Sequence, residues 1–68
     1  MNNIKWTDVQ RIAEELSDNH PQVDPLKVNF VDLMNLVLAL PDFSDDPSHC
    51  GERILEAIQQ AWIEEVSS

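Results

Sequence analysis

Carboxylate side chains gather in one short stretch of the chain, Asp42-Phe43-Ser44-Asp45-Asp46-Pro47. Paired carboxylates can act as general acid and general base, but only where burial or a neighbouring charge separates their pKa values in a site that excludes water. A short stretch that lies between prolines predicts a surface loop, which offers no such burial. We therefore predict no catalytic residue here and expect that the protein is not an enzyme.

The same carboxylates could instead bind a cation. An EF-hand is excluded, because the sixth position of a loop that starts at Asp42 is Pro47 instead of glycine and the twelfth is Arg53 instead of glutamate. Clustered carboxylates still attract divalent ions, ferrous iron included, without a preformed cage. Looser binding of a divalent ion by the loop carboxylates Asp42, Asp45 and Asp46 therefore remains open, and any such site would be weak and exposed. No organic cofactor is expected.

Softer metal ligands are few. His49 and Cys50 are neighbours and His20 lies far from them in the sequence, so they do not make up the ligand set of a closed metal site. The favoured interpretation is a loop histidine and a helix-start cysteine without chemistry. An iron-sulfur cluster scaffold is excluded, because such clusters need about four thiolates and the chain has one cysteine. One cysteine also predicts no internal disulfide, in agreement with the reducing cytoplasm.

Net charge limits the classes of partner. The 68 residues include 13 acidic and 4 basic side chains, a formal charge of −9. Such a charge repels nucleic-acid backbones and anionic membranes and attracts basic proteins or cations. The sequence contains no run of apolar residues long enough to span a membrane and no signal-peptide pattern at the N-terminus. We expect one cytoplasmic domain over residues 1–68, as a monomer.

Helical patterns cover most of the chain. Thr7 and Gln10 form a capping-box pattern, which predicts a helix over about residues 7–19. Asp24 should cap a single turn before an extended piece near Val28. A second helix is expected from residue 30 or 31 to 40, with an apolar face broad enough for a central helix, and a third over about residues 51–65. Glu52 and Glu56 should share one exposed face of the third helix. The fold class is all-α, with at most a short extended segment near Val28.

Four aromatic residues lie one to a segment. Core packing is the ordinary interpretation for Phe30, Phe43 and Trp62, and Phe43 should hold the acidic loop to the core. Trp6, just before the first helix, is a weak candidate for an interaction surface.

Three helices with short connectors are typical of a helix-turn-helix bundle, which often binds DNA. A recognition helix needs basic residues for the phosphates, and here Lys5, Arg11, Lys27 and Arg53 are scattered. DNA binding therefore remains only an alternative, suggested by fold class.

Several segments in order resemble the IscX family, also called YfhJ. They are Lys5-Trp6-Thr7-Asp8, the stretch from Pro21 to Asp24-Pro25, Val28-Asn29-Phe30, Asp42-Phe43-Ser44-Asp45-Asp46-Pro47, and Glu52-Arg53-Ile54-Leu55-Glu56-Ala57-Ile58 with Trp62. The resemblance covers nearly the whole chain. It implies a compact helical fold related to the winged helix, and an accessory protein of bacterial iron-sulfur cluster assembly. Such a protein would bind the cysteine desulfurase IscS, would bind iron through its acidic surface, and would act as iron donor, adaptor or regulator.

The chain departs from the family at two positions. Val31 stands where the family tends to have a capping threonine, so we expect Asn29 to cap the second helix with Asp32 as its partner. Cys50 stands where the family tends to have a small polar residue, and we assign it no family role.

The resemblance and the charge together predict that an acidic surface binds a basic patch of the desulfurase. The predicted partner-binding residues are Asp8, Asp32, Asp42, Asp45, Asp46, Glu52 and Glu56. The iron binding that the resemblance implies is assigned to a weak surface site for Fe²⁺ made of Asp42, Asp45, Asp46, Glu52 and Glu56. A divalent-metal buffer without a protein partner is the remaining alternative.

Overall fold

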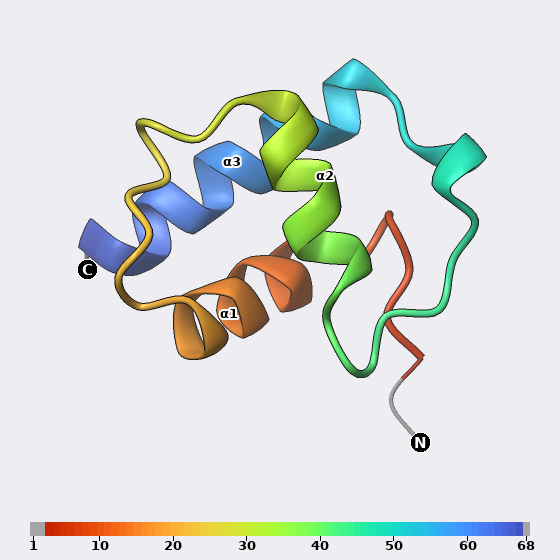
Figure 1. The fold of residues 1–68 in the computed structure, drawn as a ribbon, viewed down its shortest axis with the longest axis horizontal. Coiled ribbons are helices and arrows are strands. Elements are labelled where there is room, and N and C mark those ends of the chain that lie inside the picture. The colour runs from red at the N-terminus through yellow and green to blue at the C-terminus, as the bar shows by residue number, and fades with distance from the viewer. Residues whose placement is uncertain (1–2, 68) are drawn as a thin grey trace.

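The structure is a computed structural model that describes residues 3–67. It contains the α-helices α1 (Val9–Asn19), α2 (Phe30–Leu38) and α3 (Glu52–Ser67), and a short 3₁₀ helix, η1 (Pro47–His49), between α2 and α3 (Figure 1). No β-strand occurs within the described residues. The prediction of a small, mainly α domain with three helices is confirmed.

The predicted capping box at the start of α1 is wrong. The helix begins at Val9, Asp8 occupies the N-cap position, and no side chain caps it. The Asp8 carboxylate accepts instead from the backbone amide of Lys5 at 3.0 Å, and the Asp8 amide donates to the carbonyl of Lys5 at 2.9 Å. A tight turn before the helix therefore takes the side chain that could have capped it. The end of α1 at Asn19, ahead of Pro21, is as predicted.

The connector of residues 20–29 follows its predicted pattern. Asp24 Oδ1 accepts from the amide of Leu26 at 3.0 Å, which closes the expected single turn. Asn29 then caps α2, because its side-chain oxygen accepts from the Asp32 amide at 2.8 Å. The helix ends at Leu38, two residues earlier than predicted, although Leu40 remains buried beyond it.

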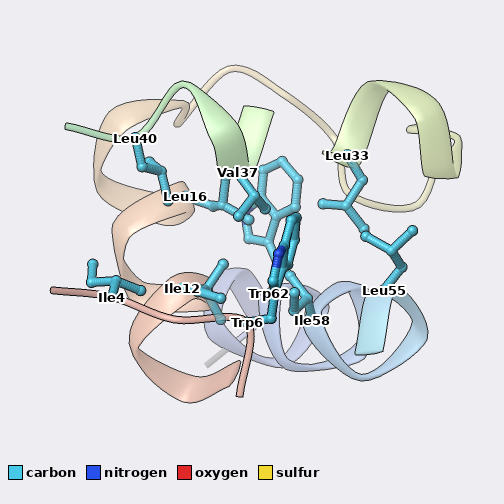
Figure 2. Packing of buried hydrophobic residues seen from close by; sticks show 11 residues of the cluster. Ile4, Trp6, Ile12, Leu16, Leu33, Val37, Leu40, Leu55, Ile58 and Trp62 are labelled. Carbon is cyan, nitrogen blue, oxygen red and sulfur yellow. The ribbon is translucent and has the colours of Figure 1, made fainter. Parts of the chain in front are cut away.

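The buried side chains form one core between the three helices (Figure 2). They are Ile4, Trp6, Ile12, Ala13, Leu16, Leu33, Val37, Leu40, Leu55, Ile58 and Trp62. The most extensive helix contact is between α1 and α3, so the prediction that the second helix is central is wrong. The indole Nε1 of Trp62 is buried and has no hydrogen-bond partner among residues 3–67.

Residues 4–6, called the N-terminal segment below, pack against the loop after α2. Ile4 forms a parallel β-bridge with Phe43, the only isolated bridge in the described part of the chain, and none forms near Val28. The Ile4 amide donates to the carbonyl of Asp42 at 2.9 Å, and the Ser44 amide donates to the carbonyl of Ile4 at 3.0 Å. Extended pairing therefore joins two segments that are far apart in sequence.

Trp6 is a core residue, so its prediction as an interaction surface is wrong. Its side chain is 1% exposed, and its ring meets that of Phe43 edge to face, with centroids 4.7 Å apart and an interplanar angle of 70°. Phe43 thereby holds the loop to the core, as predicted. Figure 2 shows Trp6 among the buried side chains of the core.

Candidate partner-binding and metal-binding surface

Residues 42–46, called the acidic loop below, lie beside the N-terminal segment (Figure 1). Beyond the bridge at Ile4, Lys5 Nζ donates to the carbonyl of Ser44 at 2.6 Å. Trp6 Nε1 donates to the carbonyl of Asp46 at 2.8 Å. The backbone of the loop is therefore held by side chains of the N-terminal segment, which lie 39 and 40 residues earlier in the sequence.

The Asp45 carboxylate is the most highly bonded side chain of the loop. Its Oδ1 accepts from the Asp46 amide at 2.7 Å and from His49 Nδ1 at 2.9 Å, and its Oδ2 accepts from the Trp6 amide at 3.1 Å. The side chain of Asp45 is only 17% exposed, whereas that of His49 is 67% exposed. The hydrogen bonds from His49, then from Trp6 and Asp46, stabilise the charged form and lower the pKa of Asp45 from 3.8 to about 2.

Asp46 caps η1. Its Oδ1 accepts from the Ser48 amide at 2.9 Å, and Pro47 occupies the first turn, where a missing amide costs nothing. The hydrogen bonds from Ser48 lower the pKa of Asp46 below its ordinary value. Asp42 differs from both neighbours, because no hydrogen bond from any residue in 3–67 reaches its carboxylate and the side chain is half-buried.

The remaining predicted acidic residues lie on helices. Glu52 and Glu56 are exposed on the first two turns of α3, and Asp32 is exposed in the first turn of α2. These positions also favour helix formation for Glu52 and Asp32, because a negative charge near a helix N-terminus interacts well with the helix dipole. Asp8 lies at the start of α1 and is bonded to Lys5, as described above.

The structure does not gather these carboxylates at one point. In Figure 1 the acidic loop lies near the N-terminal segment, whereas the first turn of α3 lies beyond η1, at the other end of the connecting stretch. Within residues 3–67 no group of three or more His, Cys, Asp or Glu residues is arranged to hold a metal ion. The arrangement is a set of dispersed charges, suited to a broad contact, and the Fe²⁺ site remains a prediction.

The softer ligands are also dispersed. His20 follows the end of α1, where its amide donates to the carbonyl of Leu16 at 2.8 Å. His49 is engaged by Asp45, and Cys50 is half-buried against the core. Burial raises the pKa of the Cys50 thiol, which disfavours the reactive thiolate.

The sequence did not predict three interactions. They are the pairing of the N-terminal segment with the acidic loop, the hydrogen bond between His49 and Asp45, and the hydrogen bonds from the side-chain amide of Gln59 to the connector of residues 20–29. The side-chain amide of Gln59 donates to the carbonyl of Pro25 at 2.8 Å and to that of Val28 at 3.3 Å. One signal was present, because Ile4 and Trp6 are apolar with Lys5 between them, which is the period-two pattern of an extended segment. No pattern pointed to the other two.

Among residues 3–67, no helix has both the length and the apolar character needed to cross a membrane.

Comparison with known protein families agrees with the resemblance found in the sequence. The family model described as iron-sulphur cluster assembly matches residues 4–67. The chain is also 61% identical over 62 residues to a Pseudomonas aeruginosa protein named "Uncharacterized protein PA3808", and the alignment covers 91% of this chain and 94% of that protein. With a family match over almost its whole length, the chain belongs to the iron-sulphur cluster assembly family, the IscX (YfhJ) family that its motifs resemble.

Proposed function

We propose that this protein is a non-catalytic adaptor of iron-sulphur cluster assembly, which binds the cysteine desulfurase IscS through its acidic surface and carries Fe²⁺ weakly on the same surface. The family match supports the general role. The main support for electrostatic binding is the net charge of −9, whose carboxylates are exposed on several elements and are not collected in one pocket.

The dispersed arrangement favours a protein partner over a metal buffer. Each exposed ion pair contributes little to affinity, so several must act together on a basic patch. The proposed surface is the one named from the sequence, and each of its carboxylates either contacts the partner or holds a neighbouring part of the surface in place: Asp42, Asp45, Asp46, Glu52 and Glu56, with Asp8 and Asp32 as extensions. Attraction between opposite charges on the two proteins accelerates their association, and it weakens when salt screens the charges.

The test is a titration of the desulfurase with this protein at low and at high ionic strength. We expect the dissociation constant to rise by at least about tenfold between 50 and 500 mM salt. The variant Glu52→Gln/Glu56→Gln should weaken binding more than Glu14→Gln/Asp18→Asn, which removes the same charge from exposed positions of α1. Binding that is insensitive to salt, or equal effects of the two variants, would refute the electrostatic mode on this surface.

Iron binding needs a separate measurement. A spectroscopic titration with Fe²⁺ under anaerobic conditions should show weak binding to the unmodified chain and none to a variant with Asn at residues 42, 45 and 46. Iron binding that survives this replacement would place the ion elsewhere. A mobility shift with random and genomic DNA tests the alternative of a DNA-binding module, and we expect no shift because the net charge opposes contact with phosphates.

A further inference from the structure

Asp45 has little capacity left to bind a ligand. A carboxylate has two oxygens with about four acceptor sites in total. Oδ1 already accepts from Asp46 and His49, and Oδ2 accepts from Trp6. About one acceptor site remains, on Oδ2 of a side chain that is 17% exposed. A cation or a basic side chain that takes both oxygens of Asp45 must therefore displace protein donors.

The bonds of Asp45 connect the two segments that build this surface. The Trp6 amide belongs to the N-terminal segment, which also pairs with the acidic loop through Ile4 and through the Trp6 indole. The amide of Asp46 and the ring of His49 belong to the chain that leaves the loop. The half-buried carboxylate of Asp45 thus connects the N-terminal segment, the acidic loop and η1.

Asp42 has the opposite character. Its backbone carbonyl is fixed by the Ile4 amide at 2.9 Å, while its carboxylate accepts no hydrogen bond from residues 3–67. Within the acidic loop, Asp42 is therefore the aspartate that an external cation can engage without displacing an internal donor. Asp42 and Asp45 therefore differ in role although they carry the same charge.

We propose that Asp45 is a positioning residue, which clamps the N-terminal segment to the acidic loop and so fixes the backbone from which Asp42 meets the partner. Asp45 does not itself contact the partner. The assignment of a partner contact to Asp42 rests on the proposed function, whereas the clamp is a property of the free protein. Three of the residues that the sequence grouped as equal ligands thereby separate into a clamp, Asp45, a cap, Asp46, and a contact, Asp42.

Amide hydrogen exchange on the full-length protein tests the clamp without any ligand. Asp45→Asn is compared with Asp42→Asn, which changes the charge equally. An asparagine has a single acceptor oxygen, so it cannot accept from all three donors that Asp45 now holds. We expect Asp45→Asn to accelerate exchange at the amides of Trp6 and Ser44 by about tenfold or more, and Asp42→Asn to change it by less than about twofold. Equal protection in both variants would overturn the clamp.

A second variant covers the case in which Asp45→Asn does not fold. His49→Ala removes one donor to Asp45 from a side chain that is 67% exposed, so the fold should tolerate it. Exchange at the Trp6 amide should then rise by about threefold. No change in this variant would also count against the clamp, because the loop would then be held without the His49–Asp45 bond.

The second measurement uses the desulfurase and separates contact from positioning. For a contact residue, removal of the charge makes the dependence of affinity on salt less steep, whereas a positioning residue lowers affinity and leaves that dependence unchanged. We expect the first result for Asp42→Asn and the second for Asp45→Asn. If Asp45→Asn flattens the dependence as much as Asp42→Asn does, Asp45 is a contact and the proposal is wrong. If the unmodified chain fails to bind, the proposed function is refuted, and hydrogen exchange alone decides the clamp.

Discussion

The two tryptophans of the core should respond differently to the same substitution. Trp6 is 1% exposed and donates from Nε1 to the carbonyl of Asp46, whereas Trp62 is 0% exposed and its Nε1 has no partner among residues 3–67. Trp→Phe removes three ring atoms at either position, which costs about 2 kcal/mol in lost burial and residual cavity. The polar contribution then decides which variant is less stable.

For Trp6→Phe the lost hydrogen bond adds about 1 kcal/mol, so the free energy of unfolding should fall by about 3 kcal/mol. The carbonyl of Asp46 still accepts from the His49 amide at 3.0 Å, so no orphaned acceptor increases this loss. For Trp62→Phe the substitution removes an unpaired buried donor whose desolvation costs about 1–3 kcal/mol. The two contributions nearly cancel, and the net change should lie within about 1 kcal/mol of zero.

The assay is urea unfolding followed by far-ultraviolet circular dichroism, because each variant loses a fluorophore. If the free energy of unfolding depends on urea concentration with a similar slope in all three proteins, the unfolding midpoints give the differences in the free energy of unfolding directly. We expect Trp6→Phe to be less stable than Trp62→Phe by about 2–4 kcal/mol. Equal losses would refute the reasoning, because they would show that the Trp62 indole has a hydrogen-bond partner in solution.

Three further predictions concern the caps, acid stability and the connector. Asn29→Ala should destabilise the protein by about 1 kcal/mol in urea unfolding, whereas Thr7→Ala should change stability by less than about 0.5 kcal/mol because Thr7 caps no helix. The pKa of Asp45 is lowered from 3.8 to about 2 in the folded state, so its contribution to stability is present above about pH 4 and is lost as the pH falls toward 2. Asp45→Asn should therefore show a smaller drop in urea midpoint between pH 6 and pH 2.5 than the unmodified chain does, and an equal drop would count against this assignment. Gln59→Ala should cost about 1–2 kcal/mol and accelerate amide exchange in the connector, because two carbonyl oxygens lose their donor. The exposed Gln60→Ala is its control, and equal effects of the two would contradict the role of Gln59.

Three local signals, at Asn29, at Asp24 and before Pro21, were interpreted correctly. Asn29 caps α2 through an amide three residues away, and Asp24 closes its turn through an amide two residues away. The end of α1 before Pro21 follows from the restricted backbone of the residue that precedes proline. In each of these three cases the residues that decide the structure are neighbours in the chain, so the sequence pattern was enough to predict it.

The start of α1 shows where local reasoning becomes ambiguous. Thr7 and Asp8 are both good capping residues, and the sequence favoured Thr7 through its spacing to Gln10. The structure begins the helix at Val9, because Asp8 closes a turn on the amide of Lys5. That turn directs the N-terminal segment toward the acidic loop, with which it pairs. The loop is about 35 residues away in the sequence, so the pattern of residues around Asp8 does not reveal this pairing.

The sequence by itself determined that this protein is acidic and mainly helical, that its carboxylates concentrate after the second helix, and that its motifs belong to an iron-sulphur cluster assembly family. Only the tertiary structure decided what each carboxylate does. Asp45 receives the amide of a residue 39 positions away, while Asp42 receives no side-chain hydrogen bond from the described residues. The reason is that the number of acceptor sites left free on a carboxylate depends on which donors the fold brings close to it. Contacts between segments that are distant in sequence produce no periodic pattern from which they could be predicted.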